Sequence, residues 1–342
     1  MSGVFSTMLL VNASVGIFWG WLSDRWSVRG TIAITGILMG LGIFLSSFTT
    51  SLWQIYICFG LVAGIGLGGT AGPLSALAMR WFQKRPAMAI SIGYAGIGAG
   101  SACLAILAER LIAFGGWRFA LQIFGYMAWA AYFIGFLLLR EFRASNRQIK
   151  MNCEQPNVDP GVAETQQTTE DYSMPVYEAL TTRAFWTLLL MVVIATMGMF
   201  LVYVHLVPRA LDLNISTAAA ALLLTLVALM EIVGKLSGGV LGDRFGYKRL
   251  FFISMLLVCL TMIWFAASSN LWMLLLFAVT FGIFNGFWTS QFPALAGFHF
   301  GTRHLGTIVG AMLLGSGIGG VLGPMMAGFV FDSSGSYRVA FV

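Results

Sequence analysis

Ten apolar runs, each long enough to cross a bilayer, constrain the fold of this chain more than any other feature. A helix of about 20 apolar residues spans the hydrocarbon core, and lipid forces the backbone polar groups to bond within the segment. A β-barrel would instead show alternating segments of about 10 residues. We therefore predict an all-α polytopic membrane protein with spans at about 3–22, 31–49, 52–79, 87–113, 117–140, 185–207, 216–241, 249–268, 271–297 and 305–331.

The composition agrees with a chain that has lipid as its solvent. Charged residues are 9% of the chain and apolar residues 58%, whereas a soluble domain has about 25% charged residues. The basic residues behind the net charge of +6 lie in short loops, so we expect a lipid bilayer and no nucleic acid as partner. The cysteines show no disulfide or metal spacing. With no nucleophile or carboxylate pair on a loop, we expect no enzyme, no metal and no cofactor.

One short motif occurs twice, as GWLSDRWSVR at 20–29 and as GVLGDRFGYK at 239–248, at an offset of 219 residues. Each copy ends one apolar run and precedes the next. Three alternate glycines in 96–100 recur in 315–319 at the same offset. The stretch between the two halves is polar and contains three prolines. The chain is therefore predicted to be a duplication, with halves at 1–140 and 185–342 and a linker at 141–184.

The loops alternate in charge along the chain. Fourteen of the 19 basic residues fall on one side of the predicted membrane, four fall on the other, and Lys235 lies within a span. Positively charged loops stay in the cytoplasm. We therefore expect a cytoplasmic location for the loops 23–30, 80–86, 141–184, 243–249 and 298–304.

The same offset compares the ends of the two halves. The counterpart of span 185–207 would precede Met1, and the counterpart of span 117–140 would begin near residue 336. Repeats of six helices are an established transporter plan. We therefore expect that the chain lacks the first of twelve helices and most of the last.

The doubled motif resembles that of the major facilitator superfamily, where it follows the second and eighth of twelve helices. The resemblance covers essentially the whole chain and implies a fold of two six-helix repeats. The motif residues it identifies are thought to hold and release one access state of such a transporter. In this sequence they are Gly20, Asp24, Arg25, Arg29, Gly239, Asp243, Arg244, Gly246, Lys248 and Arg249. The first copy has Ser27 where glycine is usual.

Two further segments resemble the monocarboxylate transporter group and its oxalate/formate antiporter relatives. Residues 81–96 match a signature before that group's fifth helix, through Phe82, Lys84 and Arg85 among others. Glu231 and Lys235 resemble an acid–base pair on that group's eighth helix, which is implicated in proton coupling and anion binding. The pair is usually Asp and Arg there. The resemblance implies Glu231 as the proton-coupling residue and Lys235 as a substrate-binding residue.

Glu231 and Lys235 also stand out without any family knowledge, because they are the only acid and base well inside a span. A spacing of four residues places both on one helix face, about 6 Å apart along the axis. Charges at mid-membrane cost about 2.5–3.5 kcal/mol and usually face a wet cavity. The alternative is a structural pair that neutralises itself.

The aspartates of the motif, Asp24 and Asp243, end helices on the predicted cytoplasmic side. A carboxylate there can cap the N-terminus of a neighbouring helix, and the adjacent arginine can pair across the bundle. We expect these contacts to form a bistable switch. The alternative is that the charges only set the topology, which explains the arginines but not the aspartates.

Asn285, Trp288 and Thr289 share one face of the span 271–297. By resemblance this span is the family's tenth helix, which lines the transport cavity, so the three residues are candidates for substrate binding. The alternative is helix–helix hydrogen bonding, which amide side chains commonly make in membranes.

The sequence predicts a secondary transporter of a small organic anion that moves with protons. Exchange of organic anions, as in oxalate/formate antiport, remains an alternative because Lys235 alone would serve it. A truncated fragment that does not transport is the alternative from a different class. The resemblance to bacterial antiporters leads us to expect the inner membrane of a bacterium.

Overall fold

The computed structural model describes residues 2–82, 84–139 and 173–334, and every regular element in these ranges is a helix. The first half begins with two helices and continues with a run that is α-helical at both ends and π-helical between. A very long helix then ends this half. In chain order the elements are α1 (Ser2–Arg25), α2 (Val28–Ser46), α3 (Leu52–Ile55), η1 (Tyr56–Ala63), α4 (Gly64–Gly68), α5 (Ala71–Trp81) and α6 (Pro86–Leu138).

The second half contains one short helix and five long ones. Side-chain caps mark several of the starts: Thr182 accepts from the Phe185 amide, and Asn270 accepts from the Met273 amide. The elements are α9 (Val176–Thr181), α10 (Arg183–Asp212), α11 (Thr217–Phe245), α12 (Tyr247–Ala267), α13 (Leu271–Phe300) and α14 (Leu305–Ser334).

Nine helices in the described ranges are long and apolar enough to cross a membrane, and α6 accounts for two crossings. It has 53 residues, which would extend about 80 Å as one rod, far beyond a hydrocarbon core of about 30 Å. The helix breaks at Gly116, whose φ of 79° and ψ of 173° suit only glycine. The segments before and after Gly116 correspond to the predicted spans 87–113 and 117–140, so the ten predicted spans are confirmed as helices.

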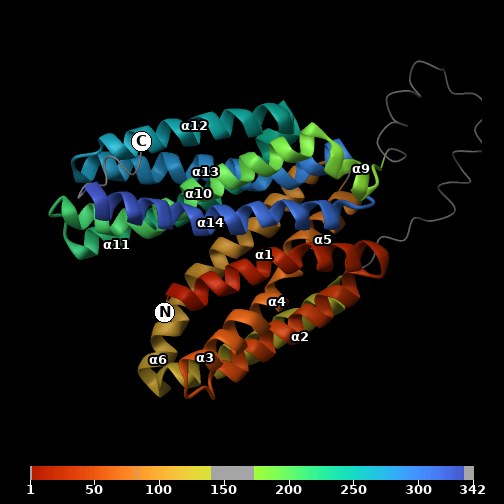
Figure 1. Ribbon diagram of the computed structural model, residues 1–342, viewed down its shortest axis with the longest axis horizontal. Coiled ribbons are helices and arrows are strands. Elements are labelled where there is room, and N and C mark those ends of the chain that lie inside the picture. The colour runs from red at the N-terminus through yellow and green to blue at the C-terminus, as the bar shows by residue number, and fades with distance from the viewer. Residues whose placement is uncertain (1, 83, 140–172, 335–342) are drawn as a thin grey trace, which may run out of the picture.

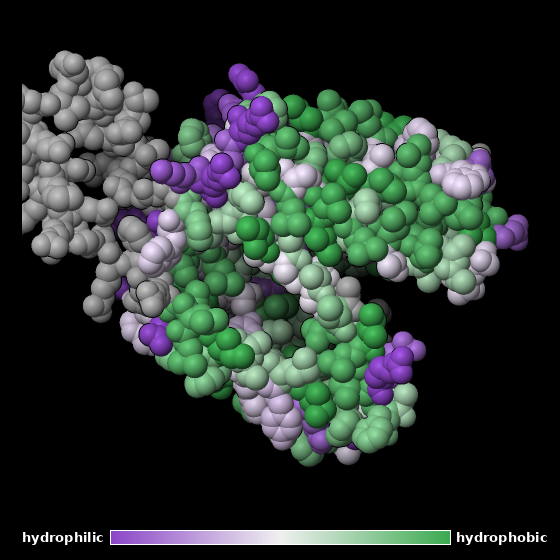
Figure 2. Space-filling model, turned by 180° about the vertical axis from the view of Figure 1, so that it is seen from behind, coloured by the Kyte–Doolittle hydropathy of each residue, from purple (hydrophilic) through white to green (hydrophobic). Residues whose placement is uncertain are grey.

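The helices form two bundles, one from each half of the sequence (Figure 1). The bundles approach each other at the end where α5 and α9 lie, and they diverge toward the opposite end (Figure 1). Seen from behind, the surface is hollowed between the two lobes and is mostly apolar around its outside (Figure 2). Large apolar side chains such as Ile37, Phe114 and Trp272 are exposed, as expected of a surface that faces lipid.

Glycines allow helices of the second bundle to pack backbone against backbone. A Cβ atom on Gly286 of α13 would fall on the backbone of Glu231 and Lys235 in α11. A Cβ atom on Gly234 of α11 would fall on the Ile283 carbonyl of α13. Close packing of small residues is the main source of helix association in lipid, so these two glycines fix the position of α11 against α13.

The repeated glycines of the two halves have different surroundings. In α14, Gly315 and Gly319 pack against Val193 and its neighbours in α10. Their counterparts in α6, Gly96 and Gly100, have no atom within 4 Å of a Cβ placed on them. The difference follows from the repeat, because no helix of the described first half occupies the place that α10 occupies in the second.

The packing of α11 on α13 predicts that Gly286→Ala lowers the melting temperature of the purified protein. Overpacking by an extra carbon costs about 1–3 kcal/mol, and the atoms that a Cβ at Gly286 would strike are backbone. Thermal melting in detergent micelles measures the effect.

The matched control is Gly135→Ala in α6, where no atom lies within 4 Å of the added carbon. Alanine favours a helix over glycine by about 1 kcal/mol, so the control should melt at the same or a higher temperature. Equal melting of the Gly286 and Gly135 variants would contradict the packing role of Gly286.

Candidate functional site

Glu231 and Lys235 form an ion pair inside α11. The Lys235 Nζ atom lies 2.8 Å from the Glu231 Oε1 atom. Glu231 is 9% exposed and Lys235 is 6% exposed. In the part of the chain that the structure describes, no other ion pair lies well inside a span. The predicted spacing on one face is therefore confirmed, and the charges neutralise each other away from water.

Tyr203 of α10 completes this group. Its hydroxyl donates a hydrogen bond to the Glu231 Oε2 atom, so a donor occupies each oxygen of the carboxylate. A buried carboxylate is stable only when its lone pairs are satisfied. The sequence analysis missed Tyr203, because one tyrosine in an apolar helix, 28 residues from its partner, leaves no signal in the sequence.

The three candidates on α13 lie beside this group but do not touch its charged atoms in any described contact. Asn285 is fully buried and accepts a hydrogen bond from the Trp288 indole at 2.8 Å. Trp288 is itself buried in the core, and the Thr289 hydroxyl bonds to the carbonyl of Asn285. The Asn285 Nδ2 atom is buried and has no hydrogen-bond partner within the described ranges. Their role in substrate binding stays a prediction.

Asp24 at the end of α1 caps the start of α14, which belongs to the other half. Its Oδ2 atom accepts from the Thr307 amide at 2.8 Å and from the Thr307 hydroxyl at 2.9 Å. Its Oδ1 atom accepts from the Gly306 amide at 3.3 Å. Gly20 allows this contact, because a Cβ atom there would strike the backbone at Gly306.

Asp243 at the end of α11 makes the corresponding contact in the opposite direction. It accepts from the amides of Ala87 and Met88 at 3.1 and 3.0 Å, at the start of α6. Gly239 again permits close approach, since a Cβ atom there would lie 2.8 Å from the Met88 Cα atom. Ala87 and Met88 precede Gly306 and Thr307 by the same 219 residues that separate the two aspartates. The two caps are therefore related by the repeat, and each joins one half to the other.

Arg80 strengthens only the first of these caps. Its Nη2 atom lies 3.0 Å from the Asp24 Oδ1 atom and also donates to the carbonyls of Thr302 and Arg303. Asp243 contacts the hydroxyl of Tyr247 instead. The arginine that crosses between the halves is thus Arg80, whereas the sequence analysis expected the arginines beside the aspartates.

The remaining basic residues of the motif face outward at the same end of the molecule. Arg25 and Arg244 stack over the rings of Trp21 and Phe245 at 5.5 and 5.6 Å. Lys248 and Arg249 are exposed at the start of α12, where Gly246 adopts a φ of 93°. These charges fit an end of the molecule that faces water.

Phe82, Lys84 and Arg85 form an exposed turn between α5 and α6, next to the helix start that Asp243 caps. Since the caps join 23–30 to 298–307 and 243–249 to 80–88, the four basic loops described by the structure lie at one end. We call it the basic end.

The fold and these contacts define a polytopic helical membrane protein of two repeat-related bundles that are held together at one end. The family model of the Major Facilitator Superfamily matches residues 1–210 and 188–342. The chain belongs to this superfamily, whose members are transporters.

Curated relatives and solved structures agree with this assignment. The chain is 29% identical over 350 residues to monocarboxylate transporter 12 of Xenopus laevis, covering 98% of this chain and 74% of the relative. It is 28% identical over 327 residues to monocarboxylate transporter 13 of Rattus norvegicus, covering 94% and 71%. Both relatives come from vertebrates, so the comparisons give no support for the expected bacterial inner membrane; they support a multi-pass membrane protein.

The crystal structure of the major facilitator transporter FucP in the outward conformation has a TM-score of 0.74 at 14% identity, with 99% of this chain and 84% of that chain covered. The proton:xylose symporter XylE, bound to 6-bromo-6-deoxy-D-glucose, has a TM-score of 0.73 at 14% identity, with 99% and 81% covered. At this identity the likeness shows the shared fold.

The Tyr203 contact predicts a measurable coupling between Tyr203 and Glu231. Tyr203→Phe should lower the melting temperature in detergent, because a hydrogen bond to a charged group is worth about 1.5–3 kcal/mol. The same change made in Glu231→Gln should cost clearly less, since a neutral amide accepts more weakly. A double-mutant cycle measures the difference. Tyr126→Phe, at an exposed tyrosine of α6, is the control, and additive effects of the two changes would contradict the contact.

The caps predict that the two bundles separate more readily at the basic end when either aspartate is neutralised. Asp24→Asn and Asp243→Asn each weaken a charged cap worth about 0.5–2 kcal/mol. Spin labels at Trp26 and Phe245, exposed and related by the repeat, should report a larger share of long distances. Asp212→Asn at the exposed end of α10 is the control, and an unchanged distance distribution in both cap variants would contradict the role of the caps.

Proposed function

We propose that this protein carries a small monocarboxylate together with a proton across a membrane by alternating access. The observation that carries the proposal is the Glu231–Lys235 ion pair, which lies buried inside a membrane-spanning helix. Intramembrane ionisable residues usually serve ion or proton paths. The similarity to monocarboxylate transporters over almost the whole chain supports the choice of substrate class.

Charge balance explains how such a pair couples two substrates. In the empty site the negative Glu231 and the positive Lys235 sum to zero. A proton alone on Glu231 leaves one positive charge, and an anion alone on Lys235 leaves one negative charge. Only the empty site and the site with both substrates are neutral. Because an unbalanced charge in the membrane is costly, these two states are the ones that change access readily.

The proton and the carboxylate act in sequence on the same pair of side chains. A proton added to the Glu231 carboxylate removes the charge that holds Lys235 at 2.8 Å. The Lys235 ammonium is then free to bind the substrate carboxylate. Tyr203 keeps Glu231 in place through the other oxygen. The orphaned amide of Asn285 is a further donor on the neighbouring helix, and we retain Asn285, Trp288 and Thr289 as candidate substrate residues.

The inter-half caps give this cycle its two access states. The caps hold the bundles together at the basic end, while the surface is hollowed between the lobes (Figure 2). Positively charged loops favour a cytoplasmic position for that end. In our proposal the structure therefore represents a state closed to the cytoplasm, and release of Asp24 and Asp243 from their helix starts opens it.

Exchange of one organic anion for another is the second candidate function. It needs the Lys235 cation but not the protonation of Glu231, because the counter-substrate would supply the balancing charge. The two functions therefore differ in what they require of Glu231.

Transport by the purified chain in liposomes separates these candidates. Uptake of labelled lactate should rise with an inward proton gradient, and Glu231→Gln should abolish that rise while leaving lactate–lactate exchange. Lys235→Gln should reduce both by about tenfold or more, since a charged hydrogen bond worth about 1.5–3 kcal/mol is lost. Glu109→Gln, at an exposed acid of α6, should behave as the unaltered chain.

Each alternative has its own outcome in this assay. Proton-driven uptake that survives Glu231→Gln would contradict the proposed coupling. Exchange without any response to the proton gradient would favour the antiporter. A chain that folds but neither accumulates nor exchanges lactate or oxalate would favour a fragment that does not transport.

A further inference from the structure

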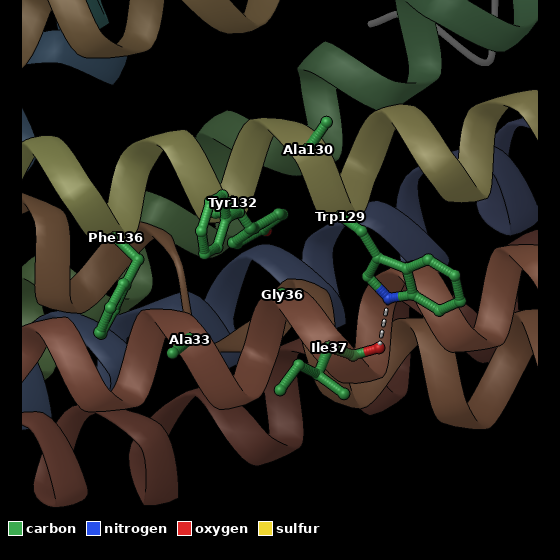
Figure 3. A pocket seen from close by; sticks show the side chains of 8 residues that line it. Ala33, Gly36, Ile37, Trp129, Ala130, Tyr132 and Phe136 are labelled. Carbon is green, nitrogen blue, oxygen red and sulfur yellow. Dashed lines mark hydrogen bonds between the residues drawn. The ribbon is translucent and has the colours of Figure 1, made fainter.

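An apolar groove of about 590 Å³ lies between α2 and the second segment of α6, away from the Glu231–Lys235 pair. Its volume is within the range of about 300–1,000 Å³ that is typical of ligand pockets. Figure 3 shows Tyr132 lying over Gly36, with Phe136 and Ala33 at one end and Trp129 at the other. Ile37 and Phe133 on its walls are largely exposed, so the groove opens to the surroundings of the bundle.

The internal contacts of the groove leave it without a polar group for a ligand to bind. The Trp129 indole donates to the Ile37 carbonyl at 3.1 Å, and the Tyr132 hydroxyl contacts the Met39 sulfur at 3.3 Å. A polar molecule placed there would lose its hydrogen bonds to water. The occupant of the groove itself is therefore hydrocarbon.

A cation lies at the Phe136 end of this groove. The Arg29 guanidinium carbon is 4.0 Å from the centre of the Phe136 ring. Its Nε atom is buried and has no hydrogen-bond partner among the residues that the structure describes. Arg29 belongs to the doubled motif, yet the described contacts do not join it to the other half. Its position provides an unused donor and a positive charge where the groove meets the basic end.

The length of the groove matches one leaflet of a bilayer. From Arg29 to Ile37 the helix α2 rises by about 12 Å, and half of the hydrocarbon core is about 15 Å. A molecule that fills the groove and reaches Arg29 therefore has a hydrocarbon tail about one leaflet long and an anionic head at the membrane surface.

We propose that the groove between α2 and α6 is a binding site for an anionic phospholipid, with an acyl chain against Gly36 and Tyr132 and the phosphate on Arg29. Basic pockets between membrane helices are known to bind anionic headgroups. The inference does not depend on transport, because neither the groove nor Arg29 contacts Glu231 or Lys235 in any described interaction.

Native mass spectrometry of the purified full chain tests this site with two phospholipids that differ only in headgroup. Palmitoyl-oleoyl phosphatidylserine should be retained about fivefold more than the matching phosphatidylcholine, as expected for one basic residue near anionic lipid. Arg29→Gln should remove this preference and Arg29→Lys should keep it. Lys248→Gln is the matched control, since Lys248 is the counterpart of Arg29 in the second half.

Ala33→Phe tests the hydrocarbon part of the site. It introduces the residue found at the equivalent position 252 of the repeat and fills the groove beside Phe136. Retention of both phospholipids should fall several-fold, whereas Ala131→Phe, at an exposed residue of α6 outside the groove, should change nothing. Melting curves of all variants confirm that they remain folded.

Three outcomes would overturn the proposal. The first is equal retention of the two phospholipids, or a preference that survives Arg29→Gln. The second is binding of glycerol 3-phosphate as tight as that of phosphatidylserine, which would show a headgroup site without the groove. The third is a single-span protein that co-purifies in place of lipid and is released by Ala33→Phe, which would make the groove a helix-docking surface.

Discussion

The arrangement of the two bundles depends on two carboxylates, each of which lies at the end of one helix and caps the start of a helix from the other half. Asp24 binds the amides of Gly306 and Thr307, and Asp243 binds those of Ala87 and Met88. A helix start carries unpaired amides and a partial positive charge, so one carboxylate satisfies both needs at once. These contacts fix the basic end, and the hollow between the lobes follows from them (Figures 1 and 2).

The buried pair in α11 follows a different rule from the caps. Glu231 and Lys235 satisfy each other within one helix, with Tyr203 as a neutral third member from α10. The caps bind across the halves near the membrane surface, while the pair is shielded and belongs to the second half alone. Under the proposed function, the pair determines when the bundles can move and the caps determine which end opens.

Much of this structure could be predicted from the sequence because it follows from periodic or repeated features. Long apolar runs predict the ten spans, and the offset of 219 residues relates Asp24 to Asp243 and, in the structure, their capped helix starts as well. The spacing of Glu231 and Lys235 predicts their contact, because both lie on one helix. What could not be predicted depends on tertiary packing: Tyr203 reaches Glu231 from another helix, and Arg80, 56 residues from Asp24, replaces the adjacent arginine. Burial of Asn285 and Trp288 likewise depends on how α13 sits in its bundle.

The two caps differ in what can be exchanged on each side of the contact. An ion pair between two side chains can be reversed by swapping the residues, but a helix start presents its amides whatever its sequence. The carboxylate side of each cap is therefore the side on which a substitution is decisive, while the residues at 87–88 and 306–307 are open to change as long as they carry an amide and leave room for the neighbouring backbone. Random mutagenesis of these four positions should thus tolerate many small residues and reject proline at any position whose amide is bonded. The contact that joins the halves is written almost entirely in two aspartates and the two glycines that let them approach.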